Sequence, residues 1–155
     1  MAAPIKRLFR PKNPSKYKGN PTRIVSRSSW EFRMMEYLDT HPDVIQWSSE
    51  EFCIPYRSPI DNKIRRYFPD FWVKMKDREG KLRVVVIEVK PFRQTQPPKK
   101  QTTPKTQRPT KQYINEVKTW GINSAKWKAA REFCEDRRWE FRIMTEREIY
   151  GKKPQ

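Results

Sequence analysis

The stretch RRYFPDFWVKMKDREGKLRVVVIEVKP, residues 65–91, decides the fold of this chain. The turn KDREGK separates two apolar segments and predicts a β-hairpin whose second strand is apolar enough to be buried. Glu88 and Lys90 stand at the end of that strand, and they share one face because strand side chains alternate. A hairpin with its turn near Arg78-Glu79 places Asp70 beside Glu88. A slip of one residue in the register would turn the two carboxylates to opposite faces.

Two adjacent carboxylates repel each other unless a cation offsets their charge. A divalent cation with oxygen ligands does so, and Mg²⁺ is the expected ion, with Mn²⁺ able to substitute for it. Asp70, Glu88 and the backbone carbonyl of Val89 are the predicted ligands. Lys90 would neutralise charge on a bound phosphate or orient the attacking water. The pattern therefore predicts a metal site that cleaves phosphodiesters. The alternative is an ordinary ion pair between Glu88 and Lys90 at a strand end.

The positive charge of the chain is large and unevenly placed. Lys plus Arg number 35 and Asp plus Glu number 18, which gives a net charge of +17. Residues 1–30 carry eight basic residues and residues 91–111 carry six, and neither segment contains an acid. Blocks of one sign favour solubility, but they are more typical of arms that bind nucleic acid. We therefore expect a nucleic-acid partner.

Other features exclude several classes of protein. Cys53 and Cys134 form no CxxC pair, so we expect reduced, structural cysteines and a cytosolic setting. His41 is the sole histidine and precedes Pro42 at an expected helix end, so no zinc site is predicted. No apolar run approaches the roughly 20 residues of a membrane span, and the N-terminus lacks the apolar core of a signal peptide.

The chain reads as one domain with basic extensions. Residues 1–27 are rich in Pro, Lys, Asn and Ser without a sustained period, which predicts an extended basic arm. Residues 28–150 form the predicted domain and residues 151–155 a tail. A helix is expected to begin after Ser28 and to end at His41, with its inward side chains at Trp30, Met34, Tyr37 and Leu38.

The remaining pattern predicts an α/β fold with a mixed sheet flanked by helices, in the order αβββαβ. The loop at residues 92–111 has almost no hydrophobic residues and is expected to be long, mobile and basic. The final helix is expected to be capped by Asn123 or Ser124 and to bury Trp127, Ala130, Phe133 and Cys134. Strands are expected in residues 43–59 (with a break near 48–50), 65–75, 82–90 and 139–145, and helices in 113–121 and 123–138.

Pro69-Asp70 followed by Glu88-Val89-Lys90 resembles the motif of the PD-(D/E)xK nuclease superfamily. The resemblance implies a restriction-endonuclease-like core with a metal bound by the motif carboxylates. The phrases PTRIVSRSSWEFRMMEYLD, WSSEEFCIPYRSPIDNKIRRYFPDFWVK and IEVKP further resemble the head completion nucleases of T4-like tailed phages. They are similar, less closely, to the endonuclease subunit of Tn7-type transposons. The phage resemblance implies an enzyme that joins the filled capsid near the portal and processes DNA ends there.

Glu31 has two interpretations. Ser28-x-x-Glu31 is a capping box, in which the glutamate bonds a backbone amide at the helix start. The superfamily often adds a glutamate from its first core helix, so the resemblance favours a site role for Glu31 as a metal ligand or a water-orienting group. Glu36, one turn further along, is expected to be solvated.

Several basic residues could contact DNA phosphates or simply form a solvated basic face. Such contacts give an affinity that falls steeply with salt and carries no sequence information. The tryptophans are spaced along the expected elements, which favours packing in the core over base stacking. The candidate DNA-binding residues are Arg65, Arg66, Lys74, Arg93, Lys99, Lys100, Lys105 and Lys126.

The sequence thus predicts a Mg²⁺-dependent endodeoxyribonuclease with Glu31, Asp70, Glu88 and Lys90 in its site. By resemblance, its partners would be DNA and phage capsid or portal proteins, and it would act in the host cytoplasm and in the assembled virion. One alternative is a DNA-binding head or connector protein with a vestigial site. Another is a junction-resolving or transposon-end nuclease.

Overall fold

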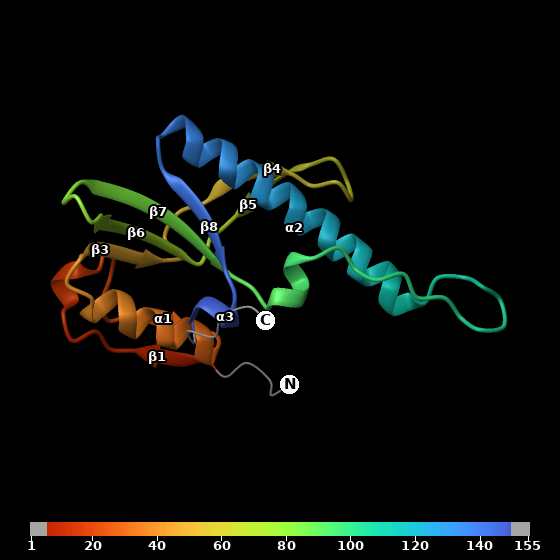
Figure 1. Cartoon of the computed structure of the whole chain (residues 1–155), viewed down its shortest axis with the longest axis horizontal. Helices are drawn as coiled ribbons and strands as arrows, with labels where there is room; N and C mark the ends of the chain where they lie inside the picture. Colours follow the sequence, from red (N-terminus) through yellow and green to blue (C-terminus); the bar gives the residue numbers. More distant parts are fainter. Residues whose placement is uncertain (1–5, 150–155) are drawn as a thin grey trace.

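A four-stranded sheet lies at the centre of the computed structural model, which describes residues 6–149 (Figure 1). The strand order is β3-β6-β7-β8. All neighbours are antiparallel except β7 and β8, which are parallel. The mixed sheet and the αβββαβ order of the core are therefore confirmed. The strands are β3 (Val44–Ser49), β6 (Phe71–Lys76), β7 (Leu82–Val89) and β8 (Glu140–Met144).

Helices cover both faces of this sheet because its central strands are apolar on both sides. Phe71 packs with α1 (Ser29–Thr40) on one face, whereas the next residue, Trp72, packs against α2 (Lys111–Asp136) on the other. The short helix α3 (Glu146–Ile149) adds to the α1 layer. The two layers lie on opposite sides of the sheet in Figure 1. Both cores are thus set by the alternation along β6 and β7.

Helix α1 begins and ends where the sequence predicts. Ser28 is the N-cap, and the His41 backbone N–H donates to the Tyr37 carbonyl at the C-terminal end. The predicted inward face is wrong at one position, since the Tyr37 side chain is 49% exposed while Met35 is fully buried. Tyr37 instead lies against the His41 ring, with the centroids 4.8 Å apart. The apolar stripe of this helix therefore turns toward Met34 and Met35.

The predicted extended arm at residues 1–27 is wrong for its described part, residues 6–27. This segment forms β1 (Arg7–Phe9), the 3-10 turn η1 (Pro14–Lys16) and β2 (Ile24–Ser26), and β1 pairs antiparallel with β2. Phe9, Tyr17 and Ile24 are buried in the α1-side core, where Phe9 and Tyr17 contact the Trp47 ring. These anchors follow no period, so the sequence pattern does not reveal them. Residues 1–5 lie outside the described residues.

A separate hairpin of β4 (Ile54–Arg57) and β5 (Ile64–Tyr67) stands beside the main sheet. Its side chains Tyr56 and Tyr67 pack in one cluster with Trp127 of α2. The strand signal at residues 65–75 is divided between β5 and β6, because Pro69 lacks the N–H that a sheet ladder needs. The chain consequently changes sheets directly beside Asp70.

A single helix, α2, replaces the two helices predicted at residues 113–121 and 123–138. Thr110 caps it, since its side chain accepts a hydrogen bond from the Tyr113 N–H at 3.1 Å, so the prediction of a cap at Asn123 or Ser124 is wrong. A helical Gly121 costs about 1 kcal/mol relative to Ala, which packing of the following turns offsets. Trp127, Ala130 and Cys134 are buried as predicted.

The first turns of α2 and the loop before them project from the body (Figure 1). We call residues 96–118 the basic arm. Thr102 and Pro109 form an isolated bridge across it, and Ile114 and Val117 are exposed on its helical part. The 3-10 turn η2 (Phe92–Thr95) lies at its base. The arm carries Lys99, Lys100, Lys105, Arg108, Lys111 and Lys118 against one acid, Glu116.

The cysteines and the helices bear on two of the expectations from sequence. Cys53 and Cys134 are both free thiols. Between residues 6 and 149, no helix combines the length and the apolar content needed to cross a membrane.

Candidate active site

The β6–β7 hairpin brings Asp70 and Glu88 to the same end of the sheet. Phe71 pairs with Ile87, so extending this register by one residue places Asp70 opposite Glu88. The Val89 backbone N–H donates to Asp70 Oδ2 at 2.7 Å, which fixes the carboxylate against β7. Of the registers that the sequence allowed, the structure has the one in which the two carboxylates face the same way.

Three carboxylates from three different elements meet at this end. Glu31 comes from the first turn of α1, Glu50 follows β3, and Asp70 precedes β6. One oxygen from each lies within 4.8 Å of the others. Burial and the nearby charges of Glu88, Glu31 and Glu50 raise the pKa of Asp70 well above its ordinary value, against the Val89 hydrogen bond. Carboxylate oxygens at this spacing suit a divalent cation, which would offset the repulsion.

Glu88 lies beside this cluster but is held differently. The Tyr67 hydroxyl donates to Glu88 Oε2 at 2.5 Å, and Lys90 Nζ lies 3.7 Å from Glu88 Oε1. Burial raises the pKa of Glu88, although the Tyr67 hydrogen bond and the Lys90 charge oppose the rise. The predicted pair of Asp70 and Glu88 is thus adjacent, and Asp70 also has Glu31 and Glu50 as carboxylate neighbours. The Val89 N–H is part of the site, through its bond to Asp70.

Glu31 caps its own helix and also lies in the carboxylate cluster. Its backbone N–H donates to Ser28 Oγ at 3.1 Å, and its Oε2 accepts from the Arg27 backbone N–H at 3.0 Å, so it does cap the helix. It is also one of the three clustered carboxylates, and burial raises its pKa. The two interpretations are therefore compatible, because one carboxylate has two oxygens.

Glu50 is the member of the carboxylate cluster that the sequence did not predict. Its backbone has φ of 53°, in the left-handed region that non-glycine residues seldom adopt. Its N–H donates to the Asp70 carbonyl at 3.2 Å, and its carboxylate pairs with Arg27 at 3.3 Å. The only sequence signal was the expected strand break near residues 48–50, which puts an acid at a strand end.

The segment after Glu50 is braced by the N-terminal region. The Tyr17 hydroxyl donates to Glu51 Oε1 at 2.9 Å and accepts from the Ser49 N–H. Gly19 has φ of 145°, and a Cβ there would lie 2.7 Å from Glu51 Oε1, so only glycine fits. The buried N-terminal segment therefore helps to hold Glu50 in place.

Comparison with known proteins agrees with this geometry. The family model described as TnsA-like endonuclease N terminal matches residues 41–146. The chain belongs to this endonuclease family. It is also 46% identical over 136 residues to the head completion nuclease of Enterobacteria phage T4, which covers 88% of this chain and 87% of that protein. Glu50, Asp70, Glu88 and Lys90 fall inside the family match, and Glu31 precedes it.

The protein is accordingly a nuclease, and its mixed α/β core is restriction-endonuclease-like, as the sequence predicted. Because the matched segment contains the β6–β7 hairpin and α2, the family assignment covers the sheet end where the carboxylates meet. The carboxylate cluster of this endonuclease fits a divalent metal.

The predicted DNA-binding residues lie in four regions of the endonuclease. Lys126 is half-buried near Glu88; burial lowers the pKa of Lys126 and raises the pKa of Glu88, while their mutual attraction opposes both shifts. Arg65 and Arg66 are exposed on β5, and Arg65 pairs with Asp61. Lys74 lies four residues along β6 from Asp70, away from the cluster. The others are Arg93 in η2 and Lys99, Lys100 and Lys105 on the basic arm.

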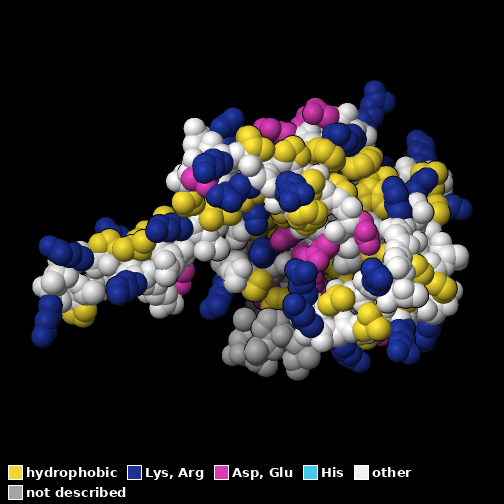
Figure 2. Space-filling model, turned by 180° about the vertical axis from the view of Figure 1, so that it is seen from behind, with side chains coloured by type: hydrophobic (Ala, Val, Ile, Leu, Met, Phe, Trp, Pro, Cys, Tyr) yellow, Lys and Arg dark blue, Asp and Glu magenta, His cyan; other side chains and the backbone are white. Residues whose placement is uncertain are grey.

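Basic side chains surround the acidic side chains on one face of the molecule. Figure 2 shows acidic side chains gathered near the middle of one face, with Lys and Arg side chains around them and the projecting part of the molecule to one side. A phosphate backbone approaching this face would meet positive charge before it meets the carboxylates.

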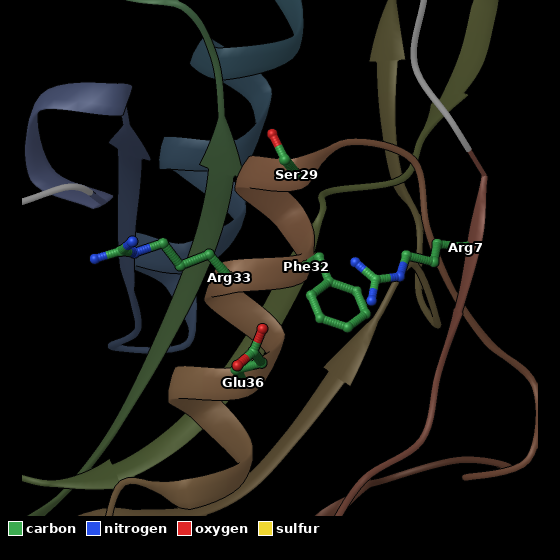
Figure 3. Close-up of a pocket in the computed structure, with 5 residues that line it drawn as sticks. All are labelled: Arg7, Ser29, Phe32, Arg33 and Glu36. Carbon is green, nitrogen blue, oxygen red and sulfur yellow. The ribbon is translucent and has the colours of Figure 1, made fainter.

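A surface pocket on the outer side of α1 is separate from this site. It is lined by Arg7, Ser29, Phe32, Arg33 and Glu36 (Figure 3). Arg7 stacks over the Phe32 ring at 3.9 Å. Glu36 is exposed here, so it lies on a different side of α1 from Glu31, in agreement with its expected solvation.

Proposed function

We propose that this endonuclease is a Mg²⁺-dependent endodeoxyribonuclease that hydrolyses DNA phosphodiester bonds during phage head completion. The observation that carries the proposal is the cluster of Glu31, Glu50 and Asp70 beside the Glu88–Lys90 pair. The 46% identity to the T4 head completion nuclease supports the assembly setting. Capsid or portal proteins would be its partners, and it would act in the host cytoplasm and in the assembled particle.

Asp70, Glu31 and Glu50 would hold the cation, with Glu88 next to them. When bound, Mg²⁺ would stabilise negative charge on the phosphate and make a water easier to deprotonate. Lys90 would orient the attacking water and neutralise charge that develops on the phosphate. Its partner Glu88 is itself fixed by Tyr67, so the lysine is held at a defined position.

Hydrolysis forms one bond from water oxygen to phosphorus and breaks one phosphorus–oxygen ester bond. The water loses a proton, and the leaving oxygen gains one from solvent. Four buried or half-buried acids would repel the DNA backbone without a cation, so metal and substrate are expected to bind together.

DNA affinity would come chiefly from the basic arm and from Arg93 at its base. The arm follows β7, the strand that carries Glu88 and Val89, after the short turn η2. DNA held along the arm would therefore be delivered to the site. Because these contacts go to phosphates, the affinity would fall steeply with salt and show little sequence preference.

The match to the TnsA-like model favours a second candidate, a nuclease that cuts transposon ends or DNA junctions. It shares the chemistry and differs in substrate. A protein that must cut two strands in concert would be a symmetric dimer in solution, so light scattering distinguishes this candidate from an end-processing monomer.

The test is cleavage of linear, branched and single-stranded DNA with Mg²⁺, with Mn²⁺ and with EDTA. Asp70→Asn is the matched inactive variant, because asparagine can still accept the Val89 hydrogen bond. We expect metal-dependent cutting that Asp70→Asn lowers at least about 100-fold, with unchanged circular dichroism. Salt-sensitive DNA binding without cutting under either metal would contradict the proposal and favour a connector protein.

A further inference from the structure

Lys126 is an unusual side chain because it lies half-buried over two aromatic rings. Its Nζ is 5.5 Å from the centroid of the Tyr67 ring and 5.8 Å from that of Tyr56. It stands on α2 next to Trp127, whose side chain is buried among the same tyrosines. The rings attract the cation and narrow the range of positions open to it. The lysine is thus a positioned group rather than a solvated one.

The charges around Lys126 identify it as part of the carboxylate end of the sheet. Glu88 and Asp70 attract it and Lys90 repels it, while burial lowers its pKa. Among residues 6–149, however, Lys126 forms no ion pair, since no carboxylate oxygen lies within 4.0 Å of its Nζ. The Glu88 oxygens are already taken by Tyr67 and Lys90. An aromatic face cannot accept all three ammonium protons, so Lys126 retains donors for an anion.

The balance of charge at the site indicates which anion. One divalent cation, Lys90, Lys126 and the Arg27 that pairs with Glu50 carry five positive charges against four carboxylates. A DNA phosphate would add the one negative charge that balances the site, and two lysines would flank it, Lys90 directly after β7 and Lys126 on α2. Electrostatic attraction is stronger in this partly dry setting than at the exposed arm. The four carboxylates are Glu31, Glu50, Asp70 and Glu88.

We propose that Lys126 is a second phosphate-binding lysine of the active site, which contacts a non-bridging oxygen of the phosphate that is cut. The inference rests on the proposed nuclease function. Lys126 would be a catalytic residue, because it touches the reacting phosphate and stabilises charge that increases as the water attacks. It transfers no proton in this role. Its effect therefore falls on the cleavage step more than on overall DNA affinity.

The position of Lys126 on α2 also connects the site to the basic arm. Lys111, at the start of the helix, and Lys126 are fifteen residues apart, or about 22 Å along an α-helix. A DNA backbone that binds the arm and follows α2 would reach Lys126 next to Glu88. The same helix, α2, would therefore guide DNA to the site and supply one contact to the phosphate that is cut.

The experiment compares Lys126→Met, Lys126→Arg and the control Lys128→Met. Methionine keeps an unbranched apolar stem, arginine keeps the charge, and Lys128 is an exposed lysine on the same helix. Single-turnover cleavage of a duplex with Mg²⁺ gives the rate of the chemical step. We expect Lys126→Met to lower that rate about 100-fold, Lys126→Arg to recover most of it, and Lys128→Met to leave it unchanged.

A second readout does not depend on cleavage. Duplex affinity is measured against salt for each substitution in an Asp70→Asn background. Loss of one phosphate contact should lower the slope of log K against log salt by about 0.9 for Lys126→Met, with no change for Lys128→Met. If the slope falls although the wild type does not cut, the phosphate contact stands and the proposed nuclease function fails.

Two results would overturn the role of Lys126. One is a cleavage rate and a salt slope for Lys126→Met that match those of Lys128→Met. The other is Lys126→Arg being as slow as Lys126→Met with an equally lowered melting temperature, which would mean that Lys126 acts only through packing against Tyr56 and Tyr67.

Discussion

The carboxylate cluster and the basic arm differ in charge, burial and support. Asp70 is next to fully buried residues such as Phe71, and its position is fixed by β7. The arm has one isolated bridge and the Thr110 cap, and its lysines are exposed. A site that does chemistry needs fixed distances, whereas a surface that binds a long polyanion needs charge more than geometry. Cutting and binding should therefore be separable by mutation.

The largest expected effect is on the cleavage rate, after substitution of Glu31, which is both a clustered carboxylate and a helix cap. Glu31→Gln can still accept the Arg27 N–H, so the helix start is kept, but the charge is lost. We expect cleavage to fall at least about 100-fold. The melting temperature should not fall, because burial disfavours the charged form of Glu31.

The control for Glu31 is Ser28→Ala, which removes the cap and leaves the carboxylate. It should cost about 1 kcal/mol of unfolding free energy in a denaturant titration, with cleavage per folded molecule unchanged. If Glu31→Gln cuts normally and is as unstable as Ser28→Ala, Glu31 is a cap alone.

The second prediction removes charge from the arm. Replacing Lys99, Lys100, Lys105 and Arg108 with Gln should weaken duplex binding more than about tenfold and reduce the salt slope by up to about 3.6. Cleavage at saturating DNA should stay near the wild-type rate, because no arm residue belongs to the carboxylate cluster. Fluorescence anisotropy across a salt series gives both quantities.

A matched control removes four charges from the β6–β7 turn, at the other end of the strands from Glu88. It carries Lys76→Gln, Arg78→Gln, Lys81→Gln and Arg83→Gln. If this variant loses as much affinity as the arm variant, then net charge and not the arm determines binding, and the contrast between the two regions is lost.

The smallest expected effect is on the Mg²⁺ requirement, after substitution of Glu50, which is half-buried in the cluster. Glu50→Gln removes one candidate metal ligand while its backbone contact to Asp70 remains. We expect the Mg²⁺ concentration for half-maximal cleavage to rise about tenfold. The rise in melting temperature caused by Mg²⁺ should shrink as well, which a thermal shift assay measures without DNA.

Glu51→Gln is the neighbouring control for Glu50. Its amide oxygen can still accept from Tyr17, and Glu51 is outside the cluster. An equal change in Mg²⁺ requirement for both variants would argue that the segment after β3 acts through its conformation and that Glu50 does not bind the metal.

Prediction from sequence succeeded where the signal was local. The hairpin around KDREGK has its turn and paired strands within residues 65–91, so one short stretch was enough to place Asp70 beside Glu88. The Ser28 cap and the end of α1 at His41 are local in the same way. The predicted cap at Asn123 or Ser124 failed because a local signal competed with packing of a longer helix, and the longer helix won.

The sequence by itself determined the order of helices and strands along the chain, the hairpin at residues 65–91, the basic segments and the carboxylates at the strand ends, because periodicity and turns act over a few residues. Only the tertiary structure brought Glu31 and Glu50 to Asp70 and laid Lys126 over Tyr67. It also buried Phe9 and Tyr17, which lie in the N-terminal segment that the sequence predicted to be extended. Those positions depend on how separate elements pack across the sheet. Packing of this kind leaves no periodic trace in the chain, since each contact joins residues that are far apart in sequence.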